Sequence, residues 1–336
     1  MTDKQNVAVL GAGSFGTALA HHIAVNSHNV FLWARDEALL DAIDTDGENK
    51  KYLPGVTLAE SVICCKDFSQ AVACADHVLI AIPSQYFSQT LDLINTDVQA
   101  NCGVLWACKG LEAGTGRFLS DVVADKLGSD RNHAVLSGPT FAKELACSLP
   151  TAITVAANSQ VYAESIVSLL HSDRFRTYIS DDIRGVQMGG AFKNIYAIAA
   201  GISDGLNFGA NTRVAVITRG LAELMRLGEI LGGRSETLMG LSGVGDLILT
   251  CTDDQSRNRR FGLALGRGQS AEQALLEIGQ SVEGVVATNV AFRLAQEKGV
   301  SMPIVEQVYR VINGLATPAS AVSVLLGRPS RSEHAG

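Results

Sequence analysis

The hydrophobic positions in the first half of the chain form short, nearly continuous runs. "VAVL", "HVLIAI" and "GVLWAC" are three of these runs. Such runs are typical of parallel strands that are covered on both faces. The segments between them carry apolar residues at helical spacing and can supply the crossover helices of a doubly wound sheet. The predicted strands are residues 7–10, 29–33, 62–65, 77–82, 103–108, 133–138 and 151–156, and the predicted helices include 14–26, 36–43, 85–94 and 116–127.

From about residue 184 onward, the apolar residues recur at helical spacing only. Examples are "TRVAVITRGLAELMRLGEILGG" and "PIVEQVYRVING", and glycines stand at the ends of such segments, as is common at helix ends. The change falls near residues 180–188, where "SDDIRG" interrupts the pattern. We therefore predict an α/β Rossmann-type, doubly wound and mainly parallel sheet followed by an all-helical second domain. The predicted bounds are 1–185, 186–327 and a polar tail over 328–336.

Composition supports a globular protein and argues against several function classes. The chain has 336 residues, of which 47% are hydrophobic, and this length can bury a large core without disulfides. The net charge of -7 argues against a nucleic-acid binder. The apolar runs are too short to insert into a membrane, and "MTDKQN" lacks the features of a secretory signal.

The cysteines and histidines also narrow the chemistry. The seven cysteines contain no CxxC motif, so we expect reduced thiols and a cytoplasmic protein. The seven histidines show no paired spacing suited to a metal, so no metal site is predicted.

A glycine motif follows the first predicted strand. "VAVLGAGSFGTALA" places Gly11, Gly13 and Gly16 between a strand and a helix. In a dinucleotide-binding turn the first glycine permits the tight turn, the second lets the pyrophosphate approach, and the third lets the helix pack on the sheet. The helix start then offers N–H groups and a positive dipole to the pyrophosphate. Because strands flank the motif on both sides, we predict dinucleotide binding; the alternative is a glycine-rich turn without a ligand.

The end of the second predicted strand bears on the choice between NAD and NADP. An acid that binds the ribose usually stands there, but this chain reads "FLWARD". Arg35 suits a 2′-phosphate, which favours NADP(H), whereas Asp36 keeps NAD(H) open. The alternative is that Arg35 is a solvated loop charge.

Two segments follow later strands, at the sheet edge where ligands bind in open α/β folds. "WACKGLE" places Lys109 there, and "LSGPTFAKE" places Gly138 and Thr140 there. Each could equally be an ordinary loop.

Lys193 stands in the apolar helical segment "MGGAFKNIYAIAAGI". A long side chain on a helix leans toward positions i−3 and i−4, which are Gly190 and Gly189 here. We expect these glycines to leave space for a ligand beside the ammonium, with Asn194 as a neighbouring donor. A partly desolvated lysine near a second cation has a lowered pKa and can donate a proton near neutral pH. The alternative is a lysine that reaches out of an amphipathic helix.

Two further segments carry candidate site residues. In "LSGVGDLILTC", Asp246 could pair with the active lysine, or it could cap a helix. In "DDQSRNRRFG", Ser256, Arg257 and Asn258 stand where a helix is predicted to begin. That arrangement can hold a phosphate through N–H groups and a guanidinium, although a solvated basic helix face is the alternative.

The motifs together identify a family resemblance. "GAGSFGTALA", "CKGLE", "LSGPTFA", "GAFKNIYAIAAGISDGL", "NTRVAVITRGLAE" and "SRNRRFG" occur in the order seen in bacterial NAD(P)-dependent glycerol-3-phosphate dehydrogenases, and the resemblance extends to about residue 325. It implies reversible reduction of dihydroxyacetone phosphate to sn-glycerol 3-phosphate, which supplies glycerophospholipid synthesis. It also implies a homodimer. No nucleic-acid partner is expected.

The resemblance also assigns roles to individual residues. Lys193 would donate and accept the proton, with Lys109 and Asp246 beside it as catalytic residues. The residues implied for substrate are Lys109, Gly138, Thr140, Lys193, Asn194, Asp246, Ser256, Arg257 and Asn258. Those implied for cofactor are Gly11, Gly13, Ser14, Phe15, Gly16, Arg35, Lys109, Ala142, Arg257, Val282 and Glu283.

Two other function classes are compatible with parts of this pattern. A 2-hydroxyacid or ketoacid reductase on the same plan would need a carboxylate site in place of a triose-phosphate site. A nucleotide-sensing regulator could keep the fold without the chemistry, but the presence of Lys109, Lys193 and Asp246 argues against it.

Overall fold

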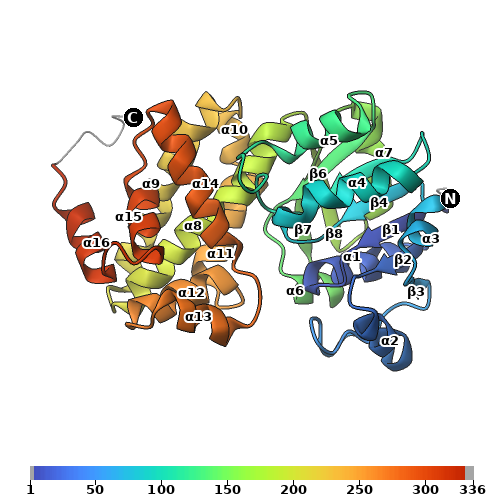
Figure 1. Cartoon of the computed structure of the whole chain (residues 1–336), viewed down its shortest axis with the longest axis horizontal. Helices are drawn as coiled ribbons and strands as arrows, with labels where there is room; N and C mark the ends of the chain where they lie inside the picture. The colour runs from blue at the N-terminus through green and yellow to red at the C-terminus, as the bar shows by residue number, and fades with distance from the viewer. Residues whose placement is uncertain (1–3, 330–336) are drawn as a thin grey trace. The chain divides into compact units, whose positions relative to one another are not determined.

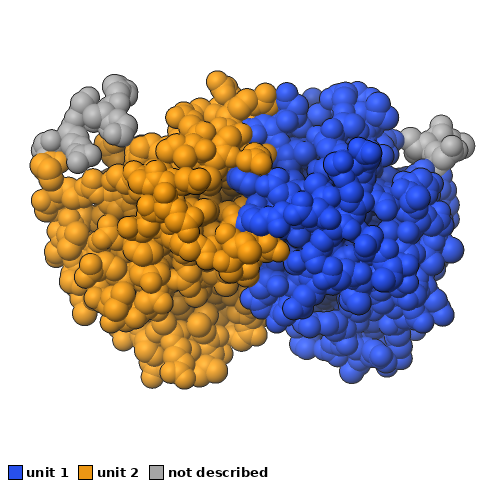
Figure 2. All heavy atoms as spheres, turned by 45° about the horizontal axis from the view of Figure 1, so that its top comes forward, with its two compact units in different colours: residues 1–108, 117–183 blue, residues 109–116, 184–336 orange. Residues whose placement is uncertain are grey.

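The structure is a computed structural model that describes residues 4–329 (Figure 1). Its residues form two compact units, 1–108 with 117–183 and 109–116 with 184–336 (Figure 2). The predicted first domain, 1–185, includes residues 109–116, which group with the second unit. The predicted polar tail lies outside the described residues from position 330 onward.

The first unit contains a mainly parallel sheet, as predicted. Its strand order is β3-β2-β1-β4-β5-β6-β7-β8, and all neighbouring strands are parallel except β6 and β7. The order reverses at β1, where a doubly wound sheet binds its ligand beyond the carboxyl ends of the strands. The bounds are β1 Asn6–Leu10, β2 Asn29–Trp33, β3 Val62–Cys64, β4 His77–Ile80, β5 Gly103–Trp106, β6 His133–Ser137, β7 Thr151–Ala157 and β8 Phe175–Ser180.

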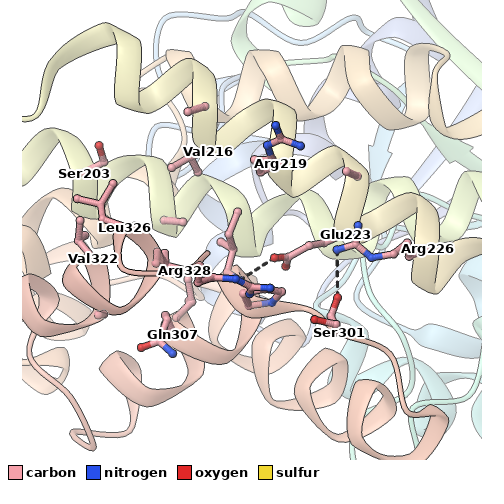
Figure 3. Close-up of a pocket in the computed structure, with 18 of the residues that line it drawn as sticks. Ser203, Val216, Arg219, Glu223, Arg226, Ser301, Gln307, Val322, Leu326 and Arg328 are labelled. Carbon is pink, nitrogen blue, oxygen red and sulfur yellow. Dashed lines mark hydrogen bonds between the residues drawn. The ribbon is translucent and has the colours of Figure 1, made fainter. Parts of the chain in front are cut away.

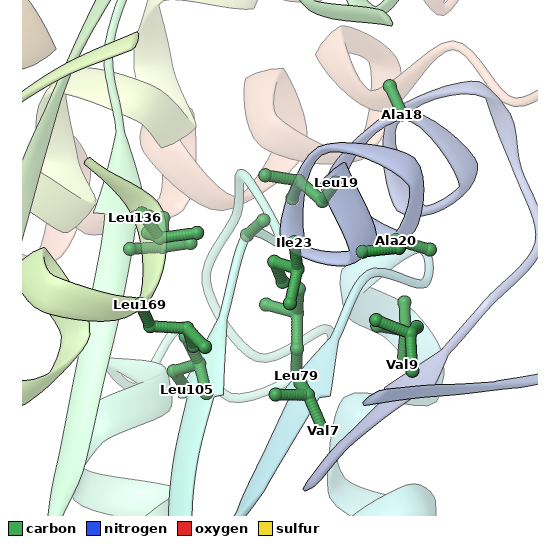
Figure 4. Packing of buried hydrophobic residues seen from close by; sticks show 14 of the residues in the cluster. Val7, Val9, Ala18, Leu19, Ala20, Ile23, Leu79, Leu105, Leu136 and Leu169 are labelled. Atoms are coloured by element: carbon green, nitrogen blue, oxygen red, sulfur yellow. The ribbon is translucent and has the colours of Figure 1, made fainter. Parts of the chain in front are cut away.

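The apolar runs of the central strands β1, β4, β5 and β6 are buried on both faces, whereas β2 and β3 are only partly buried. In β1, Val7 and Val9 belong to the main hydrophobic cluster, while Ala8 and Leu10 lie outside that cluster and are also fully buried. Helix α1 packs its Leu19 and Ile23 into the cluster (Figure 4). The helices of this unit are α1 Ser14–Val25, α2 Glu37–Asp46, α3 Phe68–Ala73, the short η1 Ser84–Tyr86, α4 Phe87–Asp97, α5 Leu119–Leu127, α6 Ala142–Ala146 and α7 Gln160–Leu170.

The regular elements described in the second unit are all helices, as predicted. Its longest helix, α8, has buried residues on all faces, which is expected of a helix enclosed by others. None of the helices described is long and apolar enough to cross a membrane. The bounds are α8 Ile183–Gly205, α9 Gly209–Ile230, α10 Ser235–Leu238, η2 Leu241–Gly245, α11 Asp246–Thr252, α12 Arg257–Gly266, α13 Ala271–Ile278, α14 Glu283–Lys298, α15 Pro303–Ile312 and α16 Pro318–Leu326.

Glycines bring the backbones of α8 and α12 into close contact. A Cβ atom on Gly201 would lie 2.2 Å from the carbonyl oxygen of Arg259, and one on Gly262 would lie 2.1 Å from that of Ile198. Real Cβ atoms do not approach backbone so closely, so neither position accommodates a side chain without a shift of the helices. This contact fixes the start of α12 against the middle of α8.

Candidate active site

The glycine turn of the first unit has the form that a pyrophosphate site needs. Gly11 adopts a φ of +121°, and a Cβ atom there would lie 2.5 Å from the carbonyl oxygen of Ala81. A Cβ atom on Gly16 would lie 1.9 Å from the carbonyl oxygen of Gly11, so α1 packs directly on the turn. By contrast, a Cβ atom on Gly13 would meet nothing within 4 Å. The turn is therefore tight where it packs and open where a ligand would approach.

The two residues after Gly13 begin helix α1. Ser14 is its first residue, and Gly13 occupies the N-cap without a side chain to satisfy the first N–H groups. Phe15 packs against the main hydrophobic cluster. A bound anion could accept hydrogen bonds from this helix start, which also carries the positive end of the helix dipole.

Arg35 and Asp36, which follow β2, make different contacts. The Arg35 guanidinium carbon lies 4.5 Å from the ring centroid of Tyr86, which belongs to η1 after β4. Asp36 caps α2, because its carboxylate accepts a hydrogen bond from the backbone N–H of Leu39 at 3.1 Å. The same carboxylate accepts a hydrogen bond from the Lys51 ammonium at 3.3 Å. Asp36 is thus engaged in local structure. Sequence reasoning missed Tyr86, because a single aromatic residue after a strand carries no signal of its own.

A second segment of this unit with candidate site residues follows β6. Gly138 comes directly after the strand with a φ of +155°, and Ala142 is the first residue of α6. Between them, the Thr140 hydroxyl is buried and has no hydrogen-bond partner among the described residues. An unpartnered buried hydroxyl is what a site built to bind a polar ligand would contain.

In the second unit, Asp246 holds two lysine ammonium groups. The Lys193 ammonium donates to one carboxylate oxygen, and the Lys109 ammonium donates to the other at 2.7 Å. Asp246 and Lys193 are almost entirely buried, with side chains 1% and 7% exposed. The alternative considered from the sequence, in which Lys193 reaches out of its helix to solvent, is therefore wrong. So is the alternative that Asp246 caps a helix, because Gly245 occupies the cap position of α11.

Thr250 completes this buried cluster and was missed by sequence reasoning. Its hydroxyl accepts a hydrogen bond from the Lys193 ammonium at 2.8 Å and donates to the backbone carbonyl of Asp246 at 2.6 Å. The signal available was its position four residues after Asp246, on the same face of a helix.

Gly189, one of the two glycines predicted to leave open space beside Lys193, serves packing instead. A Cβ atom on Gly189 would lie 2.2 Å from the carbonyl oxygen of Ser242 in η2. The missing side chain therefore lets the backbone of η2 approach α8. Because α11 follows η2 directly, this contact sets the distance between Asp246 and Lys193.

The environment of Lys193 changes its acidity. Burial lowers the pKa of Lys193 to about 7, with Asp246 acting in the opposite direction and the nearby Lys109 ammonium lowering it further. An amine with this pKa exchanges protons readily near neutral pH, as a general acid and base must.

A row of polar side chains connects α8, α12 and α14. The Asn258 amide donates to the side-chain oxygen of Asn194 at 2.9 Å, and its own oxygen accepts from the backbone N–H of Gly284 at 2.8 Å. The Asn194 amide reaches Glu283 at 3.5 Å. Burial raises the pKa of Glu283, although nearby cations, Arg257 first among them, oppose this effect. Val282 is buried at the cap of α14.

Helix α12 begins at Arg257, as predicted from the sequence. Ser256 caps it, with its hydroxyl accepting from the backbone N–H of Arg259 at 3.2 Å. The Arg257 guanidinium is half-buried and donates to the side chain of Gln280 at 3.2 Å. A guanidinium beside a helix start is a suitable place for a phosphate group. The second unit thus brings Lys109, Lys193 and Asp246 together and places Ser256, Arg257 and Asn258 at one helix start.

Comparisons with known proteins agree with these features. Residues 6–163 match the model of the NAD-dependent glycerol-3-phosphate dehydrogenase N-terminus, and residues 182–323 match that of its C-terminus. The chain is 50% identical over 334 residues to the NAD(P)+-dependent glycerol-3-phosphate dehydrogenase of Shewanella oneidensis, covering 99% of both chains. The corresponding enzyme of Pseudoalteromonas translucida is 51% identical over 333 residues, again with 99% of each chain covered.

A solved structure shows the same fold over nearly the whole chain. The crystal structure of glycerol-3-phosphate dehydrogenase from Coxiella burnetii superposes with a TM-score of 0.94 at 43% identity, covering 97% of this chain and 99% of that one. Taken with the lysine pair on Asp246 and the glycine turn after β1, these matches show that the chain belongs to the NAD-dependent glycerol-3-phosphate dehydrogenase family.

Proposed function

We propose that Lys193 donates the proton in a reversible, NAD(P)H-dependent reduction of dihydroxyacetone phosphate to sn-glycerol 3-phosphate. When bound, the dinucleotide supplies the hydride for the carbonyl carbon. The carbonyl oxygen then needs a proton, and the neutral amine can take one back in the reverse reaction. The observation that carries this proposal is the burial of the Lys193 ammonium against Asp246 and Thr250, which, with Lys109 nearby, places its pKa near 7.

Lys109 and Asp246 have supporting roles in this proposal. Lys109 adds positive charge where negative charge develops on the substrate oxygen. Asp246 orients both ammonium groups, since each of its carboxylate oxygens accepts one of them. Two ammonium groups and one carboxylate leave a net positive charge for an anionic substrate.

Each unit, taken by itself, has residues that we propose for substrate binding. In the second unit, Ser256, Arg257 and Asn258 hold the phosphate at the start of α12, together with Asn194 of α8. In the first unit, Gly138 and the unpartnered hydroxyl of Thr140 contact the substrate.

Cofactor contacts centre on the glycine turn. Its open face at Gly13 and the start of α1, whose cap residue has no side chain, fit a pyrophosphate. Arg35 binds the 2′-phosphate, so NADP(H) is favoured over NAD(H). The proposed cofactor-binding residues are Gly11, Gly13, Ser14, Phe15, Gly16, Arg35, Lys109, Ala142, Arg257, Val282 and Glu283.

We further infer a cytoplasmic homodimer that supplies glycerophospholipid synthesis. The family resemblance supports this inference, and the many helical faces of the second unit offer surface for a partner subunit.

One assay tests the proposed substrate. Purified protein is mixed with NADH or NADPH, and loss of nicotinamide absorbance is measured with dihydroxyacetone phosphate, unphosphorylated dihydroxyacetone and a 2-keto acid. Turnover of dihydroxyacetone phosphate alone supports the proposal, whereas preference for the keto acid would assign the chain to a different reductase reaction. Absence of turnover with all three would favour a nucleotide-sensing role.

A further inference from the structure

The second unit contains a large cavity of about 1060 Å³ (Figure 3). Its walls come from α8, α9, α15 and α16, from the segment between α14 and α15, and from residues 328–329 after α16. This volume is at the upper end of the range for small-molecule sites, which are mostly apolar with a few polar groups. Most of the lining side chains are aliphatic, among them Ile202, Val216, Val308, Val322 and Leu325.

Two polar groups of the lining have unsatisfied hydrogen-bonding capacity. Ser203 on α8 is 2% exposed, and its hydroxyl has no hydrogen-bond partner among the described residues. The Nε atom of Arg226 is also buried without a partner, while another nitrogen of the same guanidinium donates to the backbone carbonyl of Ser301 at 3.1 Å. Buried polar groups normally have hydrogen-bond partners, so a ligand with a polar group could supply the partners that the Ser203 hydroxyl and the Arg226 Nε lack.

The charges around the cavity favour an anion. Three arginines line it, Arg219, Arg226 and Arg328, against two carboxylates, Glu223 and Glu229. Glu223 already accepts hydrogen bonds from the backbone N–H groups of α15, at 2.7 Å from Ile304 and 3.2 Å from Val305. Burial also raises the pKa of Glu223 to about 7, so part of its negative charge is absent at neutral pH.

We propose that this cavity binds an amphipathic anion, an aliphatic chain with a carboxylate or phosphate head group. The chain lies against the aliphatic walls, and the head group is bound by the guanidinium groups of Arg219, Arg226 and Arg328. A narrow ligand fits better than the folded surface of a second protein copy, because only a narrow group can reach the almost fully buried Ser203. The proposal does not depend on the dehydrogenase reaction, since none of the lining residues belongs to the proposed active site.

Binding is tested by calorimetric titration of the full chain with laurate and with dodecyl phosphate, below their micelle concentrations. Butyrate controls for the length of the chain, and dodecyltrimethylammonium controls for the sign of the charge. We expect saturable binding of at least one of the two long-chain anions, with one molecule per chain, and much weaker binding of both controls. The relative affinities for laurate and dodecyl phosphate identify the preferred head group. Equal binding of the cation, or no saturable binding of either anion, would overturn the proposal.

Variants locate the site. Val216→Trp should fill the cavity and abolish binding, and Arg219→Ala should weaken it by about tenfold or more, as expected for one charge-assisted hydrogen bond. Leu326 is 77% exposed at the cavity, so Leu326→Glu and Leu326→Lys form a matched pair that should leave folding intact. The glutamate should weaken anion binding and the lysine should not. Circular dichroism and dehydrogenase turnover check that each variant is folded.

A second copy of the chain is the competing occupant. Sedimentation of the wild type and of Leu326→Glu distinguishes the two possibilities. If the glutamate dissociates an oligomer and the wild type binds neither anion, the cavity belongs to a subunit interface and the proposal is wrong.

Discussion

Lys193 and Asp246 form a buried ion pair that joins the middle of α8 to the first residue of α11. Removing one partner of such a pair leaves an uncompensated charge, which typically costs about 3–5 kcal/mol. Asp246 also has a second cationic partner, because its other carboxylate oxygen accepts a hydrogen bond from the Lys109 ammonium at 2.7 Å. The geometry thus concentrates positive charge around a single carboxylate, and this arrangement leads to two predictions about proton transfer.

Replacing Lys193 tests its role as proton donor. Lys193→Ala should lower kcat by at least about 10²-fold, the lower range for general acid–base catalysis. Binding of NADPH, measured by fluorescence titration, should change little. A variant that kept near-normal kcat would show that another group or water supplies the proton.

The pH dependence of kcat should follow the ionisation of Lys193. The protonated amine donates, so kcat for reduction should fall as the pH rises through about 7, and kcat for glycerol 3-phosphate oxidation should rise through the same range. Asp246 raises the pKa of Lys193, so Asp246→Asn should move both midpoints to lower pH. Profiles measured at saturating substrate check this. Unchanged midpoints in Asp246→Asn would mean that Asp246 does not control the ionisation that the profile reports.

The sequence predicted the strands that are buried on both faces, because their apolar runs are continuous. It did not predict β8, Phe175–Ser180, because only Phe175 of this edge strand is buried and its residues form no continuous apolar run. The strand–turn–helix context of Gly11, Gly13 and Gly16 was also predictable, since all three positions lie within one local motif.

The site in the second unit was predictable residue by residue, but its connections were not. Lys109 and Asp246 are far apart in the sequence, and only the fold brings them into hydrogen-bonding distance. The amide pair of Asn194 and Asn258 is also non-local. Helical spacing alone predicts open space at Gly189, because it does not reveal which backbone packs against a glycine.

The glycine contact between α8 and α12 should be necessary for stability. In Gly201→Ala the new Cβ atom would lie 2.2 Å from the backbone oxygen of Arg259, so the helices must move apart. We expect the free energy of unfolding to fall by about 1–3 kcal/mol, the usual cost of overpacking. Chemical denaturation measures this, with the exposed substitution Thr218→Ala as a control expected within about 0.5 kcal/mol of wild type. A loss no larger than that of the control would contradict the close contact.

Arg257 should determine affinity for the substrate phosphate. Arg257→Ala should raise the KM for dihydroxyacetone phosphate by about 10–150-fold, which corresponds to one charge-assisted hydrogen bond. For unphosphorylated dihydroxyacetone, a poor substrate for the wild type, the KM should rise much less. Arg260→Ala is a matched control, because Arg260 is exposed on the same helix. Equal losses for the two substrates would refute the phosphate assignment.

Cofactor choice should depend on Arg35. Asp36 is engaged in capping α2 and in pairing with Lys51, whereas the Arg35 guanidinium lies over the Tyr86 ring and is a group suited to a 2′-phosphate. NADPH should therefore be used at least as well as NADH. Arg35→Ala should weaken the binding of NADPH by about tenfold or more and leave the binding of NADH nearly unchanged, because NADH has no phosphate at that position.

The Arg35 assignment can be checked further through Tyr86. Tyr86→Leu removes the ring under the guanidinium. It should weaken the binding of NADPH by only a few-fold, as expected for an exposed cation–π contact of about 0.5–1 kcal/mol. Tyr86→Phe keeps the ring and should bind NADPH as the wild type does. The competing possibility is that Asp36 leaves its cap and binds the ribose of NAD. In that case the wild type would prefer NADH, and Asp36→Ala would be the damaging change. Values of kcat/KM for both cofactors across the wild type and these four variants decide between the two arrangements, and a strong wild-type preference for NADH would refute the role given to Arg35.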